Sequence, residues 1–300
     1  MLSDPIGFVG LGVMGAAMSS HLLRAGVPVL GFDLNADRVA LHRDAGGMVA
    51  ANPAEVARGC ELVVTSLPSA VALHSVLTGA DGVLSADRHV VVLETSTLDL
   101  ADKLAAFTAA EAAGCALLDC PMSGTGQQAR NGDLVAYLSG AAAAKVTAGR
   151  ALVHITRAVH DVGDFGNGTR MKLVANLLVA VHNLAAAEAL LLAEQAGLDL
   201  DQVLTAVGDG AGTSRMFEIR GPLMAARSFD QATMKVSTFQ KDLDVITRFA
   251  ASLGVPVPLL TATAGYYQAA ADGGRGEQDT ACVVEVLREQ LDPARSTGPV

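Results

Sequence analysis

The chain has 300 residues, of which 51% are hydrophobic, and its formal net charge is −10. This length accommodates two domains with cores of their own, and the acidic charge argues against a nucleic-acid partner, which would require a basic surface. The four cysteines are scattered without a CxxC pair, which predicts neither a metal site nor a disulfide framework and is typical of a reduced, cytoplasmic protein.

The N-terminus predicts no targeting segment, because it passes directly into an apolar run without the charged leader of a signal peptide. We also expect no membrane span. The most apolar stretch, residues 171–196, is interrupted by Lys172, Asn176 and further polar side chains. It therefore lacks the run of about 18 uninterrupted apolar residues that a membrane helix needs.

The first half of the chain alternates short apolar runs with helical segments. The runs are continuously apolar, which is typical of parallel strands covered on both faces. They lie at residues 6–9, 27–32, 62–66, 90–94 and 116–118. Helices are expected at residues 12–24, 35–45, 53–58, 69–77 and 98–113. This order predicts a doubly wound, parallel α/β sheet of the Rossmann type.

After residue 163 the pattern becomes helical. Helices are expected at residues 169–196, 201–208, 234–252 and 258–271. We therefore predict a Rossmann domain over residues 1–163 and an all-α domain over residues 164–292. The Pro-, Ser- and Gly-containing residues 293–300 predict a flexible tail.

The first expected strand is followed by a dinucleotide-binding turn of the G-x-G-x-x-G type, Gly10-Leu11-Gly12-Val13-Met14-Gly15. Glycines at this spacing permit a tight turn and let a pyrophosphate approach the backbone at a helix N-terminus. Asp33 ends the second strand, where a carboxylate can accept hydrogen bonds from ribose hydroxyls and repel a 2′-phosphate. We therefore predict NAD as the cofactor and NADP as the less favoured one, with the nearby Arg38 weakening that preference.

Lys172 lies near the start of the apolar helix expected at residues 169–196. At about 100° per residue, it shares a helix face with Asn176 and Asn183. Burial would remove hydration from the ammonium and favour the neutral amine that general acid–base catalysis requires. An alternative is that Lys172 only extends from the first helical turn to solvent. Lys241 projects away from the apolar stripe of its helix, so periodicity alone favours a solvated side chain.

Taken in order, the motifs resemble the β-hydroxyacid dehydrogenase family, which includes 3-hydroxyisobutyrate dehydrogenase and tartronate semialdehyde reductase. The resemblance extends from residue 8 to about residue 291. Besides the glycine turn, it rests on Leu67-Pro68, Thr95-Ser96-Thr97, Asp119-Cys120-Pro121-Met122-Ser123-Gly124, Gly166-x-Gly168-x-x-x-Lys172, Asn176 and Lys241-Asp242.

The resemblance implies a role for each motif. It places Leu67, Pro68 and Ser96 or Thr97 along the nicotinamide half of the cofactor, and it directs Lys241 toward the same end. It implies that Ser123 and Gly124 bind the substrate carboxylate. It also implies that Lys172 is the general acid and base and that Asn176 orients the substrate.

Two departures from the family pattern lie in the expected substrate pocket and leave the particular substrate open. Thr125, which we expect to contact the substrate, replaces a second glycine, and Ala175 replaces the first of two asparagines. Arg215 lies where the family builds part of its substrate pocket. Its guanidinium could bind an anionic substrate group, or it could be a surface arginine.

The resemblance therefore implies a hydride transfer between NAD and the β-carbon of a small anionic β-hydroxy acid, such as 3-hydroxyisobutyrate or a threonate-type four-carbon sugar acid. Alternatives on the same fold are imine reduction and a catalytically silent NAD-binding protein. No metal is expected. The long apolar helix predicts a homodimer or homotetramer, because one small domain covers little of it.

Overall fold

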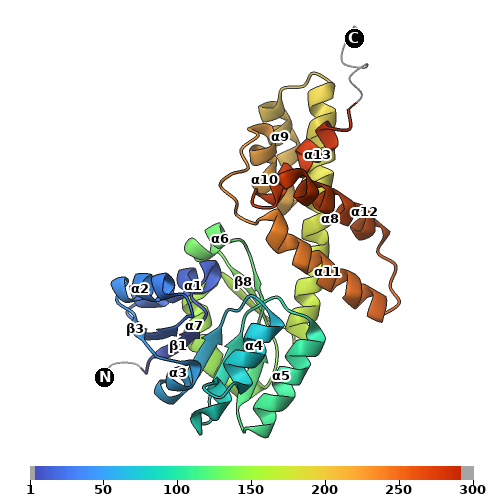
Figure 1. Cartoon of the computed structure of the whole chain (residues 1–300). Helices are drawn as coiled ribbons and strands as arrows, with labels where there is room; N and C mark the ends of the chain where they lie inside the picture. The colour runs from blue at the N-terminus through green and yellow to red at the C-terminus, as the bar shows by residue number, and fades with distance from the viewer. Residues whose placement is uncertain (1–3, 292–300) are drawn as a thin grey trace. The chain divides into compact units, whose positions relative to one another are not determined.

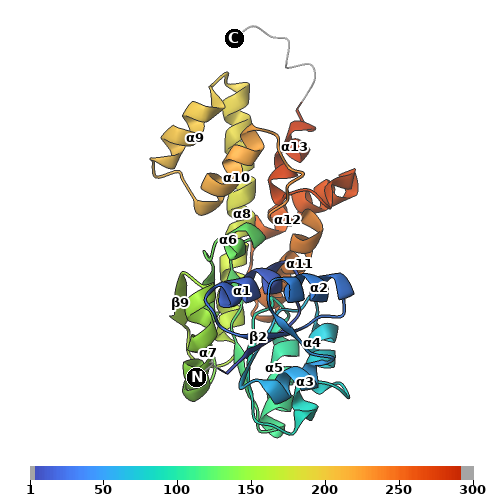
Figure 2. The ribbon, with the colours of Figure 1, turned by 90° about the vertical axis from the view of Figure 1, so that its left-hand side faces the viewer.

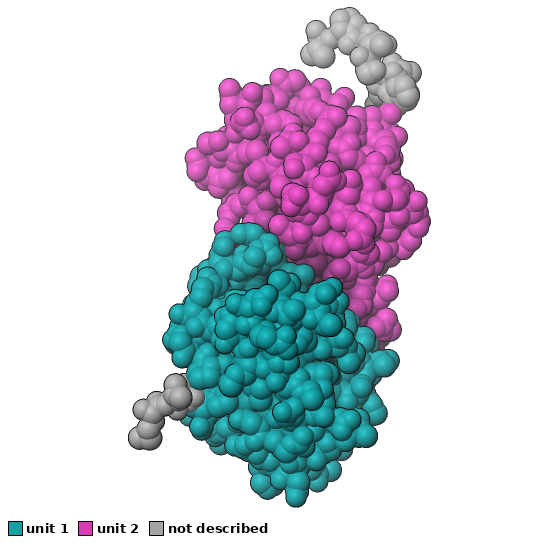
Figure 3. Space-filling model, turned by 60° about the vertical axis from the view of Figure 1, so that its left-hand side comes forward, with its two compact units in different colours: residues 1–172 teal, residues 173–300 magenta. Residues whose placement is uncertain are grey.

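The computed structural model describes residues 4–291, and the chain divides into two compact units, residues 1–172 and 173–300 (Figure 3). The predicted tail, residues 293–300, lies outside the described residues. The division falls within helix α8 (Asn167–Gln195), nine residues after the boundary predicted at residue 163. Lys172 therefore belongs to the first unit and Asn176 to the second.

A parallel six-stranded sheet forms the centre of the first unit (Figure 1). Its strands are β1 (Ile6–Val9), β2 (Val29–Phe32), β3 (Met48–Val49), β4 (Leu62–Thr65), β5 (Val91–Glu94) and β6 (Ala116–Asp119). Their order, β3-β2-β1-β4-β5-β6, reverses beside β1, where doubly wound sheets bind their ligands. The Rossmann-type fold predicted from the sequence is confirmed.

Helices cover both faces of this sheet because successive strand residues point to opposite sides. Phe8 and Val64 pack with α1 (Val13–Arg24) and α7 (Ala142–Ile155). Val63 and Val92 pack on the other face. The helices there are α3 (Pro53–Gly59), α4 (Ala70–Thr78) and α5 (Leu100–Ala112), while α2 (Ala36–Asp44) follows β2. Strands β1 and β4 are buried along their whole length, as their continuous hydrophobicity predicts.

A second sheet of three strands is absent from the sequence-based prediction. It contains β7 (Met122–Ser123), β8 (Val135–Leu138) and β9 (Ala158–Asp161), with β8 antiparallel to β7 and parallel to β9. The short helix α6 (Gly126–Arg130) connects β7 to β8. Two residues give β7 no detectable periodicity, and β9 is largely exposed, so neither strand has the apolar run of a core strand.

The second unit is helical, which confirms the predicted helical domain. Beyond α8 it contains α9 (Leu200–Gly208), α10 (Arg215–Ala225), α11 (Val236–Ser252), α12 (Pro258–Ala270) and α13 (Val283–Arg288) (Figure 2). Helix α10 was not predicted, because Gly221 and Pro222 interrupt its pattern. The core of the unit joins Leu184 and Leu191 of α8 to Phe239 of α11 and Tyr267 of α12.

By length and composition alone, helix α8 is long and apolar enough to cross a membrane. This contrasts with the prediction from the sequence that no segment of the chain has these properties. A buried core helix has the same composition. Within its most apolar 18-residue window, 44% is buried. Leu184, Ala187 and Leu190 of this helix belong to the core of the helical unit. Its apolar composition therefore has a structural explanation within the second unit.

Candidate active site

The glycine turn between β1 and α1 has the geometry of a phosphate-binding turn. Gly10 has φ of +94°, which side chains rarely permit, and a Cβ on Gly15 would lie 1.9 Å from the Gly10 carbonyl oxygen. Gly12 precedes α1, whose first turn contains no acidic residue and has no side-chain cap among the described residues. The N–H groups and the positive dipole end of α1 therefore suit a dinucleotide pyrophosphate.

The Asp33 carboxylate binds this turn from the end of β2. Its Oδ2 accepts a hydrogen bond from the Leu11 N–H at 2.7 Å, and its Oδ1 accepts one from the Asn35 N–H at 2.8 Å. The Arg38 guanidinium lies 3.6 Å from Oδ2, and a Cβ on Gly12 would lie 3.5 Å from its Nη1. A carboxylate suited to ribose hydroxyls and a cation suited to a 2′-phosphate thus lie together beside the turn.

The predicted nicotinamide-binding residues lie beside the same turn. A Cβ on Gly10 would come within 3.3 Å of the Leu67 side chain. The Leu67 N–H donates a 2.8 Å hydrogen bond to Ser96 Oγ, which joins the segments that follow β4 and β5. Pro68 is exposed and Thr97 is half-buried. The glycine turn, Leu67 and Ser96 therefore meet at the carboxyl edge of the parallel strands, where ligands bind in doubly wound sheets.

The predicted substrate segment follows β6. Ser123 is half-buried on β7, and Gly124 has φ of +145° with Leu134 only 2.7 Å from where a Cβ would lie. Thr125 caps α6: its Oγ1 accepts a 3.3 Å hydrogen bond from the Gln128 N–H, while Gln128 Oε1 accepts a 3.0 Å one from the Thr125 N–H. The replacement of glycine at this position thus has a local structural role. A substrate contact for Thr125 stays a prediction.

The first unit brings the substrate segment and the cofactor turn together. A Cβ on Gly126, three residues after Ser123, would lie 2.7 Å from Val13 Cγ1. Val13 is exposed at the first position of α1, and Met14 packs against the core beneath it. Two segments more than 100 residues apart in the sequence therefore meet where the pyrophosphate is expected.

Lys172 lies near the start of α8 and is only 7% exposed. The preceding turn packs on the end of β6. A Cβ on Gly168 would lie 2.7 Å from the Asp119 carbonyl oxygen, and Thr169 Oγ1 donates a 2.8 Å hydrogen bond to Asp119 Oδ1. Asp119 precedes Ser123 by four residues. The burial of Lys172 disfavours the alternative in which its ammonium only extends to solvent.

In the second unit, Asn176 is held by a carboxylate that was not predicted as a site residue. Asn176 Nδ2 donates a 3.0 Å hydrogen bond to Asp242 Oδ2, and both side chains are buried. Lys241 Nζ lies 3.9 Å from Asp242 Oδ1, with its side chain 43% exposed. Asp242 could have been found from helical spacing, because it falls on the buried face of α11 beside Phe239 and Val245.

Two further polar residues of the second unit have local partners. Asn183, on the helix face predicted for Lys172 and Asn176, donates hydrogen bonds to Tyr267 Oη at 2.8 Å and to the Thr280 carbonyl at 2.9 Å. Burial raises the pKa of Tyr267 to about 12, so its phenol remains protonated. Asn183 therefore stabilises the helical core. Arg215 is exposed and pairs with Glu218 of its own helix at 2.9 Å.

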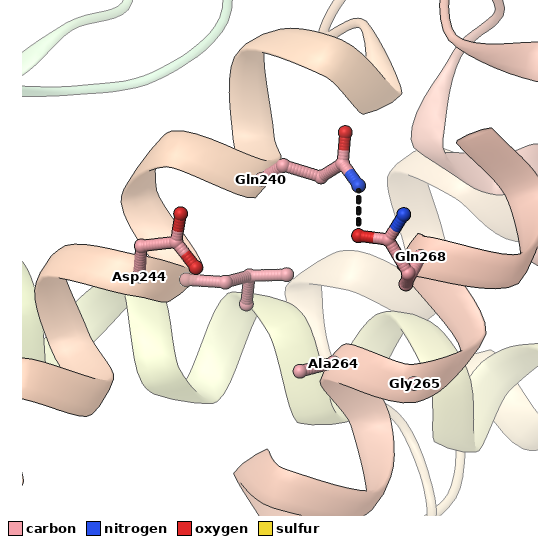
Figure 4. Close-up of a pocket in the computed structure, with 6 residues that line it drawn as sticks. Gln240, Asp244, Ala264, Gly265 and Gln268 are labelled. Atoms are coloured by element: carbon pink, nitrogen blue, oxygen red, sulfur yellow. Dashed lines mark hydrogen bonds between the residues drawn. The ribbon is translucent and has the colours of Figure 1, made fainter. Parts of the chain in front are cut away.

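A cavity of about 530 Å³ lies between α11 and α12 (Figure 4). It is lined by Gln240, Leu243, Asp244, Ala264, Gly265 and Gln268, and Gln240 Nε2 donates a 3.0 Å hydrogen bond to Gln268 Oε1. None of these lining residues was predicted as a site residue. Within residues 4–291, no group of three or more His, Cys, Asp or Glu side chains could hold a metal ion.

The fold and the glycine turn define an NAD(P)-binding protein of the Rossmann class. Residues 5–163 match the family described as the NAD binding domain of 6-phosphogluconate dehydrogenase. Residues 166–287 match the family described as the NAD-binding domain of NADP-dependent 3-hydroxyisobutyrate dehydrogenase.

Characterised relatives cover nearly the whole chain. It is 33% identical over 290 residues to the L-threonate dehydrogenase of Cupriavidus necator, covering 95% of this chain and 97% of the relative. It is 32% identical over 286 residues to the 3-sulfolactaldehyde reductase of Escherichia coli, covering 94% and 95%. A crystal structure described as 3-hydroxyisobutyrate dehydrogenase from Salmonella typhimurium matches with a TM-score of 0.84 and 31% identity, covering 95% of this chain and 100% of that chain. The chain belongs to the β-hydroxyacid dehydrogenase family, which confirms the resemblance and the predicted class of enzyme.

Proposed function

We propose that this enzyme oxidises a small β-hydroxy acid, or reduces the corresponding carbonyl acid, with Lys172 as the general acid and base. The observation that carries the proposal is the burial of Lys172 on a helix turn anchored to Asp119, four residues before Ser123. An amine in a water-poor environment can exist in the neutral form that accepts a proton.

The residues of the first unit fit a nicotinamide dinucleotide. The N–H groups at the start of α1 would hold its pyrophosphate, Asp33 its ribose hydroxyls, and Leu67 and Ser96 its nicotinamide half. When bound, the cofactor supplies the hydride acceptor or donor.

The protein residues would bind the substrate and move its proton. In oxidation, the neutral Lys172 amine removes the hydroxyl proton as the β-carbon loses its hydride. In reduction, the Lys172 ammonium returns that proton to the forming hydroxyl. Ser123 Oγ and the Gly124 N–H would donate to the substrate carboxylate. Asn176 donates to Asp242, and its Oδ1 would accept a hydrogen bond from the substrate hydroxyl.

We propose 3-hydroxyisobutyrate-like acids as substrates, with threonate-type sugar acids as the alternative. The names of the relatives include threonate, sulfolactaldehyde and 3-hydroxyisobutyrate, which are all small anions. We propose that the Arg215 guanidinium binds the negatively charged group of the substrate, which would require it to leave its ion pair with Glu218. A substrate panel of 3-hydroxyisobutyrate, 3-hydroxypropionate, glycerate, serine and threonate would distinguish the two classes.

We propose NAD over NADP because the Asp33 carboxylate lies beside the glycine turn, where it would accept hydrogen bonds from ribose hydroxyls and repel a 2′-phosphate. Arg38 opposes this preference, since its guanidinium lies beside Asp33. The Asp33→Asn variant keeps an acceptor for the Leu11 N–H and removes the negative charge. It should shift the ratio of kcat/KM for NAD to that for NADP by about tenfold toward NADP, the effect of about one charged hydrogen bond. An unchanged ratio would contradict the role of Asp33.

We also propose a cytoplasmic homodimer or homotetramer in which the exposed side of α8 lies at the interface. Val174, Leu178 and Leu192 are exposed there at helical spacing, with 56%, 48% and 73% of their surface accessible. Light scattering on the full chain should give two or four chains per particle, and a monomer would contradict the proposal.

The assignment of Lys172 is tested by the Lys172→Ala variant. Removing the acid–base group should lower kcat by about 10²–10⁴ for the best substrate of the panel. The dissociation constant for NADH should stay within about twofold, because glycine-turn contacts bind the cofactor. Lys235→Ala is the matched control, since Lys235 pairs with Glu277 on the surface at 2.6 Å. Near-normal turnover in Lys172→Ala would refute the mechanism.

A further inference from the structure

A buried charged cluster lies beneath the helix turn that carries Lys172. We call Glu94, Lys103 and Asp119 the buried triad. Glu94 ends β5, Asp119 ends β6, and Lys103 lies on α5 between them in sequence. Lys103 Nζ lies 2.6 Å from Glu94 Oε2 and 2.8 Å from Asp119 Oδ1, and all three side chains are at most 1% exposed. The proposed reaction uses none of these residues directly.

The triad keeps its lysine charged in the interior. Burial alone would lower the pKa of Lys103, but Glu94 and Asp119 raise it above its ordinary value. Two carboxylates and one ammonium leave one negative charge in excess. The positive end of the α8 dipole lies beside Asp119 and offsets part of this charge, because the N–H groups of the first helical turn have no partners within the helix itself.

Asp119 connects the triad to the first turn of α8. Its Oδ2 accepts a 2.6 Å hydrogen bond from the Thr169 N–H, and its Oδ1 accepts a 2.8 Å one from Thr169 Oγ1. Ser139 supports the same turn, since its Oγ donates to the Asp119 carbonyl at 2.9 Å and accepts from the Gly168 N–H at 3.0 Å. The start of α8 is therefore fixed by side chains from β6 and from the residue after β8.

This attachment sets the rotation of α8 about its axis. Thr169 and Lys172 are three residues apart and so lie on neighbouring positions of one helix face. A slip by one residue would turn Lys172 by about 100°, away from its present direction. The direction of the Lys172 side chain thus depends on the two hydrogen bonds that Thr169 makes with Asp119.

The other end of the triad supports the cofactor segment. Glu94 Oε1 accepts a 3.0 Å hydrogen bond from the Ser96 N–H, and Ser96 Oγ accepts one from the Leu67 N–H at 2.8 Å. One continuous network therefore joins the predicted nicotinamide-binding residues to the helix turn that carries Lys172. All of it lies within the first unit.

We propose that Thr169, Asp119 and Lys103 are positioning residues that orient Lys172 with respect to the nicotinamide-binding segment. The inference rests on the proposed acid–base role of Lys172. Proton transfer requires heavy atoms within hydrogen-bond reach, so a displacement of about 1 Å can lower the rate about 100-fold without a change in binding.

The test uses Thr169→Val, which removes the hydroxyl and keeps both the shape of the side chain and the Thr169 N–H. We expect kcat to fall by about tenfold or more, with KM for the hydroxy acid and the Kd for NADH within about twofold. Thr169→Ser restores the hydroxyl and should recover most of the loss. Thr156→Val is the matched control, because Thr156 Oγ1 donates only to the Leu152 carbonyl of its own helix at 2.7 Å.

Hydrogen exchange separates this inference from the proposed function. Without substrate, Thr169→Val should exchange the amides of residues 168–172 faster than wild type, while Thr156→Val should not. If the wild type oxidises no hydroxy acid, the proposed function fails and exchange alone decides whether Thr169 anchors the turn. Unchanged exchange refutes the anchor. Unchanged kcat in Thr169→Val with an active wild type, or equal losses in the Val and Ser variants, refutes the positioning role.

Discussion

Replacing Lys103 by Met measures how strongly the buried triad stabilises the first unit. The two contacts of 2.6 and 2.8 Å are each worth about 6 kcal/mol of Coulomb attraction at an effective dielectric constant of about 20. Desolvation of the three buried ions opposes this attraction by several kcal/mol per ion. The variant keeps the buried carboxylates but removes their counter-ion. The free energy of unfolding should therefore fall by about 3–5 kcal/mol at pH 7.

Urea unfolding at pH 7, followed by circular dichroism, measures this loss. Lys235→Met is the control, since it breaks an exposed ion pair and should leave stability nearly unchanged. A loss below about 1 kcal/mol would refute the reasoning.

Three further predictions concern other parts of the molecule. Gly15→Ala should raise the Kd for NADH about tenfold or more, because its Cβ would lie 1.9 Å from a backbone oxygen, whereas Gly149→Ala on α7 meets nothing within 4 Å and should not change it. Arg215→Ala should raise KM for the hydroxy acid with kcat unchanged, as measured by steady-state kinetics. An unaltered KM would show that Arg215 does not bind the substrate and only pairs with Glu218. Although burial alone would raise it, Arg220 holds the pKa of Asp279 below its ordinary value of 3.8. A depressed folded-state pKa stabilises the fold above the unfolded value, so this contribution should be lost as pH falls below about 4 and be absent in Asp279→Asn.

Local sequence patterns determined much of the fold. The glycine turn and the five main strands were predicted because their signals, a fixed spacing and continuous hydrophobicity, lie within short segments. Helical spacing likewise put Lys172 and Asn176 on one face of α8. The family resemblance then assigned roles that the spacing alone left open, such as those of Ser123 and Lys241.

Only the tertiary structure decided which polar residues are buried and what they bind. In the sequence, Lys103 is one of several charged residues on a helix, and nothing nearby indicates burial. It is buried because β5 and β6 bring Glu94 and Asp119 to it from both sides. The capping of α6 by the Thr125 hydroxyl was likewise not predicted. The second sheet was missed because β7 has only two residues and β9 is largely exposed, so neither has the continuous apolar run of a core strand.

The physical reason is the range of the interactions. Periodicity and turn spacing are set by the backbone over a few residues, so the sequence by itself determined the glycine turn, the parallel strands and the face of α8. The orientation of Lys172 depends on contacts such as Thr169 with Asp119, which lie 50 residues apart and meet only when the sheet has formed. The elements were therefore determined locally, while the arrangement of charges around the proposed acid–base lysine was decided by the fold.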